Sequence, residues 1–354
     1  MSIKSSYFNY KENLFEQREL FKDCFPETNG QAIQKEEHYF WKFHSFPYEK
    51  KSWEYVSYLE NEMVAYYAAI PYVYKIGNTV TPVAMVCDVM TSSKHRGKGI
   101  FTKIGSYATN EMAKDLPFTM GYPIRKEVLP GHIKVGWKVS HELPLYIKFI
   151  KFNSLFSSKK IGFLSPLGNL MISVYNNILK GRINKNYSFE ISDNVDSING
   201  FEAFSEQWRN SVQNALVKDI AFQRWRYSAP ERYYKFISIR DNGKLIGYLS
   251  LRKIIKENVP SYGVLDYMVL PGYEDCHSLI NRILVDMAKN DNVESILIMM
   301  SRTSSKKYLL KRFGFFKSPF LLKLIIKNLN NQFKDEELFN EKNWHLMWVD
   351  SDDL

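Results

Sequence analysis

The sequence DVMTSSKHRGKGIF, from Asp88 to Phe101, joins an expected strand to an expected helix through a basic turn that contains two glycines. The apolar run before it predicts a buried strand that ends near Asp88. Apolar residues at helical spacing from Ile100 onward predict an amphipathic helix. Gly97 and Gly99 let the backbone turn tightly with its N–H groups facing a ligand. Because such N–H groups at the start of a helix bind anions, the pattern predicts a phosphate-binding turn.

Three basic side chains, Lys94, Arg96 and Lys98, add positive charge to the same turn. A pyrophosphate is the ligand that such a turn suits best. The alternative interpretation is a surface turn with ordinary basic residues. The pattern is not a Walker loop, because GxxxxGK[ST] is absent, and it is not a Rossmann fingerprint, because GxGxxG is absent.

The segment Lys94–Gly99 resembles the acyl-CoA pyrophosphate loop of the GNAT superfamily, whose pattern is Gln/Arg-x-x-Gly-x-Gly/Ala. Lysine replaces the first residue of that pattern, and Ser93 stands where relatives usually have proline. The resemblance implies that coenzyme A lies against the strand end, with its pyrophosphate on the turn. The residues that it implies for acyl-CoA binding are Val89, Thr91, Lys94, Arg96, Gly97, Lys98, Gly99 and Ile100.

The chain contains an internal repeat, which is a feature to seek before any other. Asp88 and Gly136 in the first half correspond to Asp266 and Gly314 in the second, and each pair is 48 residues apart. Tyr66 and Tyr248 follow the same order, and so do the tryptophans of Phe40–Phe43 and Arg224–Tyr227. The offset drifts from 178 to 184 residues, as small loop insertions would produce. A duplication is therefore expected.

Each half shows aromatic strand patterns first, with turn signals between them. Gly77-Asn78 and Asn242-Gly243 predict hairpins, and one apolar helical face is expected after each buried strand. The expected fold class is α+β, with two tandem GNAT-like domains, each a mixed, mostly antiparallel sheet flanked by helices. The expected division is 1–150 for the acyl-CoA-binding domain, 151–200 for a connector with a helix, 201–330 for a degenerate GNAT-like domain, and 331–354 for an acidic tail.

The second copy lacks the basic turn. At the 178-residue offset, Lys94–Gly99 corresponds to Gly272–His277, where Glu274 and Asp275 would repel a phosphate. Only the first copy is therefore expected to bind coenzyme A.

Two residues are candidates for the chemistry of acyl transfer. Asp88 could take a proton from an ammonium or anchor the amine, but its counterpart Asp266 in the non-binding copy also favours a structural role. The resemblance places a tyrosine acid four residues before Gly136, where this chain has His132. A histidine can act as a general acid, and the alternative is a histidine with no catalytic role.

The acceptor is inferred from a further resemblance. A tandem GNAT-like chain with Trp225-Arg226-Tyr227 and Pro230 opening its second copy resembles N-acyltransferases of bacterial surface-polysaccharide pathways. Such enzymes acylate nucleotide-linked amino sugars, for example a dTDP- or UDP-4-amino-dideoxysugar. A basic, aromatic chain suits that acceptor, because nucleobases stack on rings and diphosphates attract cations. The candidate acceptor-binding residues are Tyr122, Arg125, Arg226 and Asp266.

Composition limits the other possibilities. The chain has 354 residues, of which 45% are hydrophobic, so it is long and apolar enough to bury a core. Its net charge of +10 divides into −5 for residues 334–354 and +15 for the rest, which favours an anionic partner. Three cysteines without a CxxC motif predict neither a disulfide framework nor a metal site, and the N-terminus shows no secretory signal. A cytoplasmic enzyme without a membrane span or a nucleic-acid partner is expected.

Several alternatives remain open. The connector includes an apolar stretch from Ile161 to Leu179 after Lys159-Lys160, which predicts either a simple linking helix or a basic amphipathic helix on a membrane. The enzyme could instead use aminoacyl-tRNA, or acetylate aminoglycosides or proteins, although the basic body suits cationic acceptors poorly. A basic module that binds polyanions is the non-enzymatic alternative, and no known nucleic-acid-binding motif supports it.

Overall fold

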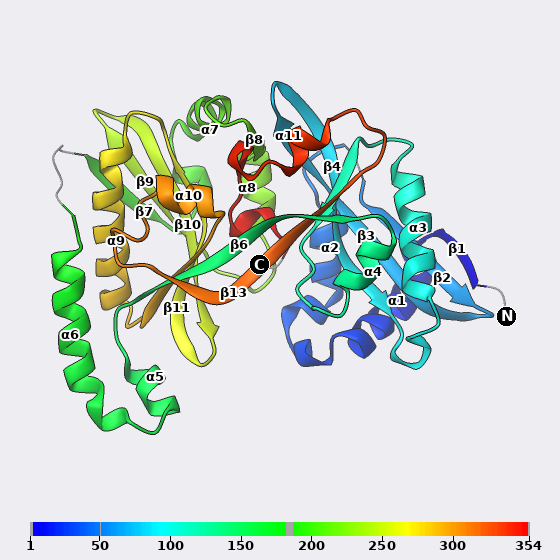
Figure 1. Cartoon of the computed structure of the whole chain (residues 1–354), viewed down its shortest axis with the longest axis horizontal. Coiled ribbons are helices and arrows are strands. Elements are labelled where there is room, and N and C mark those ends of the chain that lie inside the picture. Colours follow the sequence, from blue (N-terminus) through cyan, green and yellow to red (C-terminus); the bar gives the residue numbers. More distant parts are fainter. Residues whose placement is uncertain (1–2, 50, 182–186, 353–354) are drawn as a thin grey trace. The chain divides into compact units, whose positions relative to one another are not determined.

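The computed structural model describes residues 3–49, 51–181 and 187–352 (Figure 1). Asp353 of the acidic tail and residues 182–186 of the connector therefore lie outside the described residues. The chain divides into two compact units. The first contains Met1–His141, Arg224–Arg232 and Leu322–Asn340, and the second contains Glu142–Gln223, Tyr233–Leu321 and Glu341–Leu354. Each unit thus takes segments from both halves of the chain, a division that differs from the consecutive domains expected from the sequence.

The first unit is built on a mixed sheet with the strand order β1-β2-β3-β4-β5-β13. Within this sheet only β4 and β5 pair in parallel, and the other neighbours are antiparallel. The last strand comes from the C-terminal end of the chain, because Ile325–Asn328 of β13 pairs with β5. The strands are β1 (Ile3–Tyr7), β2 (Trp53–Leu59), β3 (Glu62–Ile76), β4 (Thr79–Thr91), β5 (Phe118–Gly121) and β13 (Phe316–Asn328).

Helices cover both faces of this sheet (Figure 1). Successive side chains of β3 point to opposite faces, so neighbouring residues of this strand contact different helices. Tyr66 packs against Phe43 of α2, whereas Tyr67 packs against Gly105 of α3. The apolar residues of α3 that the sequence predicted, Ile104 among them, are buried in the main core cluster of this unit. The helices are α1 (Tyr10–Cys24), α2 (Glu36–His44), α3 (Ile100–Met112), α4 (Leu129–Lys134) and α11 (Asp335–Phe339).

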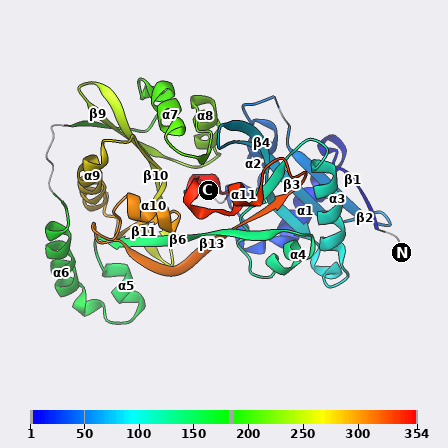
Figure 2. The ribbon, with the colours of Figure 1, turned by 45° about the horizontal axis from the view of Figure 1, so that its top comes forward.

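The second unit has a sheet with the order β6-β12-β11-β10-β9-β7, in which β11 and β12 form the parallel pair. Figure 2 labels β6, β9, β10 and β11 of this sheet. Its strands are β6 (Lys138–Phe149), β7 (Ser188–Ser192), β8 (Asn214–Leu216), β9 (Lys235–Asp241), β10 (Lys244–Lys256), β11 (Val259–Val269), β12 (Ser295–Met299) and β14 (Trp344–His345). Its helices are α5 (Asn153–Ser158), α6 (Ser165–Ile178), α7 (Phe201–Asn210), α8 (Ile220–Tyr227), α9 (His277–Asn290) and α10 (Arg302–Lys307). The C-terminal half of α8 belongs to the first unit, and so does the beginning of β6.

The internal repeat is visible in the order of the elements. The series β3-β4-α3-β5 in the first half corresponds to β10-β11-α9-β12 in the second, with one parallel pair in each. Gly136 and Gly314 have positive φ angles of 93° and 80°, which glycine adopts at little cost. The predicted hairpin turn at Asn242-Gly243 is present, with φ angles of 47° and 82°. The expected α+β class, with mixed and mostly antiparallel sheets flanked by helices, is confirmed.

The acidic C-terminal segment is folded into the units. Trp344 and Trp348 are buried in the second unit, where β14 pairs in parallel with β8. Asp335 of α11 forms an ion pair with Lys138 at 2.7 Å in the first unit. None of the helices among the described residues combines the length and the apolarity that crossing a membrane requires.

Candidate active site

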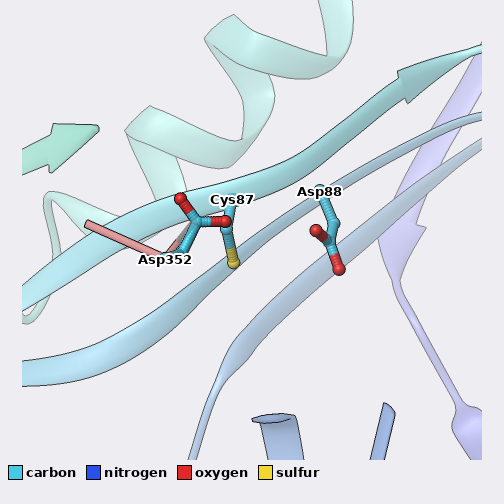
Figure 3. Close-up of side chains that lie close together, drawn as sticks. All are labelled: Cys87, Asp88 and Asp352. Carbon is cyan, nitrogen blue, oxygen red and sulfur yellow. The ribbon is translucent and has the colours of Figure 1, made fainter. Parts of the chain in front are cut away.

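The strand β4 is distorted where it approaches the basic turn. The pairing of β3 with β4 shifts register between Tyr66 and Ala68, so that Asp88 and Val89 both stand opposite Tyr67. Asp88 has a φ of 46°, in the left-handed region that non-glycine residues rarely occupy. Strain of this kind concentrates at functional sites. Because of this bulge, Cys87 and Asp88 project to the same side of β4, with a carboxylate oxygen within 4.8 Å of the sulfur (Figure 3).

The Asp88 carboxylate forms a buried ion pair with Lys42 of α2. The Lys42 Nζ lies 2.9 Å from Oδ1 of Asp88, and the two side chains are 4% and 12% exposed. Burial acts to raise the pKa of Asp88, but the charges of Lys42 and Arg18 more than offset it and hold that pKa below its ordinary value. Asp88 is therefore ionised at neutral pH, with little tendency to take up a proton.

A cluster of buried polar side chains surrounds this pair on the face covered by α1 and α2. Arg18 and His38 lie close to Asp88, and both act to lower its pKa. Burial, and then the charge of Lys42, lowers the pKa of His38 to about 3, so its ring is neutral. Within the described part of the chain, Nε2 of His38 and Nε2 of Gln17 are buried without a hydrogen-bond partner. Such groups are typical of sites that bind water or a polar ligand.

The basic turn itself has the geometry of an anion site. Gly97 and Gly99 have positive φ angles of 78° and 74°, and Gly99 precedes α3 without any side-chain cap. Lys94, Arg96 and Lys98 are exposed at the same turn. The first backbone N–H groups of a helix have no acceptor within the helix, so this helix start can receive a phosphate.

A carboxylate from α1 holds the turn in place. Asp23 accepts hydrogen bonds from the backbone N–H of Ser93 at 2.8 Å and from its hydroxyl at 2.7 Å. Burial opposes ionisation of Asp23, but these two bonds and the charge of Arg96 keep its pKa below the ordinary value. The position of the turn is therefore fixed before any ligand binds.

The two parallel strands separate beside the bulge. The pairing of β4 with β5 ends at Val86 and Gly121, although β4 continues to Thr91. No strand among the described residues pairs with 88–91 on that side, which leaves an edge that an extended amide chain can pair with. The hydroxyl of Thr91 is buried and has no hydrogen-bond partner within the described ranges. Val89 packs against the core, and Ile100 is part of it, so only their backbone groups can contact a ligand at this edge.

The other catalytic candidate, His132, lies on the opposite face of the sheet from Asp88. Its ring contacts the rings of Tyr67, Phe101 and Trp137, with centroids 5.1 to 6.3 Å away. Burial lowers the pKa of His132 to about 4, so the ring is neutral at pH 7. Asp88 and His132 are therefore not arranged on one face of the sheet as an acid–base pair.

The predicted acceptor-binding residues are divided between the two units, three in the first and Asp266 in the second. Tyr122 is buried directly after β5. Arg125 donates to the carbonyl oxygen of Cys24 at 2.8 Å and pairs with Glu27, so it ties the loop after β5 to the end of α1. Arg226 is buried next to Trp225 in the first unit, and Asp266 belongs to the second unit.

Asp266 forms its own buried ion pair, with Lys218. Their atoms are 2.6 Å apart, and both side chains are fully buried. The pairing of β10 with β11 also shifts register beside Asp266. Among the described residues, however, Asp88 has a positive φ and Asp266 does not, so the two copies share a bulge but differ in its backbone strain. Glu274 and Asp275 precede α9 in the second copy, where the first copy has its basic turn. The second copy therefore resembles the first in fold but not in charge.

Comparisons with known proteins agree with this geometry. Residues 10–139 match the family model described as an acetyltransferase (GNAT) domain. No curated protein matches the sequence significantly. Residues 10–139 therefore match a GNAT acetyltransferase domain, and the predicted enzyme class, an N-acyltransferase, is confirmed.

Solved structures are similar over nearly the whole chain. A GCN5-related N-acetyltransferase from Anabaena variabilis is 14% identical with a TM-score of 0.68, covering 93% of this chain and 73% of its own. A conserved protein of unknown function from Enterococcus faecalis is 12% identical with a TM-score of 0.63, over 94% and 74%. The N-myristoyltransferase of Saccharomyces cerevisiae with bound myristoyl-CoA is 12% identical with a TM-score of 0.61, over 92% and 83%. At these identities the likeness shows the fold.

Sequence reasoning missed the residues that surround Asp88. Lys42 lies between Trp41 and Phe43 on α2, and all three side chains are buried. A lysine inside an aromatic helical segment is the signal that could have identified it, because a buried ammonium needs a carboxylate partner. Its partner is 46 residues away in the chain, and nothing in the local pattern of either residue identifies the other.

Proposed function

We propose that this chain transfers an acyl group from coenzyme A to the amine of a small anionic acceptor, a nucleotide-linked amino sugar, in the cytoplasm. The observation that carries the proposal is the uncapped start of α3, preceded by two glycines in the left-handed region and three exposed basic side chains. A pyrophosphate is the natural ligand for that arrangement. The net charge of +10 supports an anionic acceptor.

The pantetheine arm would extend from the turn along the open edge of β4. Its amides can pair with backbone groups of residues 88–91, and the hydroxyl of Thr91 is a further polar group at that edge. This route brings the thioester to the bulge at Asp88. The proposed residues for acyl-CoA are those of the turn and the strand end, from Val89 to Ile100.

In the proposed reaction the amine nitrogen attacks the thioester carbonyl carbon, the C–N bond forms and the C–S bond breaks. The amine loses one proton and the thiolate gains one. The ionised Asp88, held by Lys42, would anchor the incoming ammonium and pass its proton to water, because its lowered pKa makes it a weak base. His132 remains the candidate for the thiol proton, but its neutral ring has only an imidazole N–H to donate.

Calorimetry with coenzyme A and acetyl-CoA tests the first half of the proposal. Gly97→Glu should weaken binding at least about tenfold, because it places a carboxylate where the pyrophosphate would lie. Gly243→Glu is the matched control, because Gly243 also has a positive φ and open space around it. It should leave binding unchanged. Failure of the wild-type protein to bind either ligand would overturn the proposal.

Thiol release from acetyl-CoA tests the acceptor. dTDP- and UDP-linked 4-amino sugars should support turnover, whereas an aminoglycoside and a lysine-containing peptide should not. Turnover with only the aminoglycoside or only the peptide would support the acyltransferase activity but contradict the proposed acceptor.

A further inference from the structure

The helix α6 turns its apolar side outward. Five residues at helical spacing form one stripe along it and are 51 to 74% exposed: Leu167, Leu170, Met171, Val174 and Ile178. Its buried residues are Gly168, Ile172 and Asn176. A surface helix of a globular protein normally buries its apolar stripe and exposes its polar one. The helix α6 does the reverse.

Polar contacts hold α6 in this orientation. The amide of Asn176 donates to the carbonyl oxygen of Phe149 at 2.9 Å, and Oδ1 of Asn169 accepts the N–H of Phe152 at 2.8 Å. At Gly168 an added Cβ would lie 2.7 Å from the ring of Phe156, so only glycine permits this approach to α5. The outward stripe is therefore a consequence of specific packing.

Neighbouring side chains enlarge the apolar surface. Phe163, before α6, is 78% exposed, and Phe316 is 51% exposed where it stacks on Tyr175 at 6.2 Å. We call this surface the α6 face, made of Phe163, Leu167, Leu170, Met171, Val174, Ile178 and Phe316. In Figures 1 and 2, α6 lies at the margin of the second unit, and no described element of that unit covers its outer side.

The segment of the chain that contains α6 carries charge of one sign. Residues 143–189 contain no Asp or Glu, but they contain six lysines and one arginine. Lys159 and Lys160 are exposed before α6, and Lys180 is exposed after it. The segment that contains Phe316 also carries exposed Lys311, Arg312 and Lys317. An apolar surface with cations at both ends is complementary to a partner that has an apolar interior and anionic groups at its surface.

We propose that the α6 face docks on the surface of an anionic lipid bilayer. The stripe would enter the boundary between headgroups and acyl chains, with α6 in the plane of the membrane, while the lysines contact anionic headgroups. At 14 residues α6 is about 20 Å long, so it can lie in this boundary but cannot cross it. Pairing with a second copy through the same face would bring like charges together.

Vesicle binding of the full-length chain tests the proposal. The protein should sediment with phosphatidylcholine vesicles that contain about one third phosphatidylglycerol, and far less with phosphatidylcholine alone. The double variant Leu170→Glu/Val174→Glu should bind at least about tenfold less, because it places two charges in the stripe. Ile255→Glu is the matched control, since Ile255 is 77% exposed on β10 of the same unit. It should bind like the wild type.

An environment-sensitive dye distinguishes insertion from simple charge attraction. The three native cysteines are buried, so Met171→Cys adds an exposed labelling site. The dye at this position should shift to the blue on anionic vesicles, and a dye at Ile255→Cys should not. Binding without that shift would overturn the proposal by showing charge adsorption alone.

Lys159→Glu/Lys160→Glu should weaken binding and reduce its dependence on salt. Light scattering provides the remaining outcome. A wild-type dimer that Leu170→Glu/Val174→Glu dissociates, together with no vesicle binding, would overturn the proposal in favour of a second copy. No vesicle binding by a monomer would overturn it as well.

Discussion

The indole rings of Trp41 and Trp225 stack with their centroids 5.2 Å apart, and each ring donates its N–H to the backbone carbonyl of the other residue. The two donor–acceptor distances are 2.8 and 2.9 Å. These tryptophans occupy corresponding positions in the two copies of the repeat, 184 residues apart. The reciprocal contact lies within the first unit, which therefore includes a piece of each copy at its core.

The tryptophan pair should make a large contribution to the stability of the first unit. Trp225→Ala should lower the free energy of unfolding by about 3–5 kcal/mol, because it removes a buried ring. Trp225→Phe should cost about 1 kcal/mol, because it keeps the stacking and removes one hydrogen bond. Urea unfolding followed by circular dichroism measures both. Trp53→Phe, at a partly exposed site, should change stability little, and an equal loss there would contradict the special role of the pair.

The Lys42–Asp88 ion pair should make the stability of a double variant differ from that of the single variant. Lys42→Met should destabilise the protein by about 3–5 kcal/mol, because it leaves a buried carboxylate without a partner. Lys42→Met/Asp88→Leu should recover most of that loss. Acyl transfer by the double variant, measured as thiol release, should be at least about 100-fold slower if Asp88 anchors the amine. A folded double variant with full activity would show that the pair has a structural role only.

The same pair predicts acid sensitivity. The pKa of Asp88 is depressed in the folded state, so its contribution to stability is present above the unfolded value and is lost as the pH falls through the folded value. The loss should therefore appear below about pH 4. Urea titrations of wild type and Lys42→Met/Asp88→Leu at pH 5 and pH 3 check this. The double variant should lose less stability over this interval, and an identical loss would show that Asp88 is not the titrating group.

We expect His132 to make stability depend on pH in a higher range than Asp88 does. Its folded pKa of about 4 lies below the unfolded value, so the unfolded chain binds a proton first as the pH falls. This one residue should therefore cost about 2 kcal/mol of stability between pH 7 and pH 5. His132→Phe, which keeps a ring between Phe101 and Trp137, should remove that part of the pH dependence. An unchanged pH dependence would mean that the ring is protonated in the folded state.

Asp23 should affect the affinity for acyl-CoA more than the rate of transfer. Asp23→Ala removes both hydrogen bonds to Ser93, so the basic turn would have to be ordered by the ligand. We expect a KM for acetyl-CoA that is several-fold higher with kcat nearly unchanged. Ser93→Ala keeps the bond from the backbone N–H and should have a smaller effect. A fall in kcat alone would place Asp23 in the chemistry.

Local patterns predicted much of the fold. The turn at Asn242-Gly243 and the helix after Gly99 were predictable because each depends on residues that are adjacent in the chain. The repeat was predictable because Asp88 and Gly136 keep the same spacing as Asp266 and Gly314. That spacing spans the end of a strand, a helix, a second strand and a short helix of nearly equal lengths in each copy.

The division of the chain and the surroundings of Asp88 were not predictable in the same way. The strand order places Ile325 of β13 beside Gly121 of β5, a pairing between segments about 200 residues apart that no local pattern encodes. Lys42 reaches Asp88 only because α2 packs over the bulge of β4. The bulge itself depends on a positive φ at Asp88, an uncommon conformation for an aspartate.

The origin of β13 also has a consequence for synthesis on the ribosome. The first unit cannot complete its sheet until Leu322–Asn340 has been translated, near the end of the chain. At ribosomal speeds of about 5–20 residues per second, β5 waits roughly 10–40 s for its partner. During that interval its outer edge is open to pairing with other nascent chains. A gene fragment that ends near codon 150 should therefore encode an aggregating product.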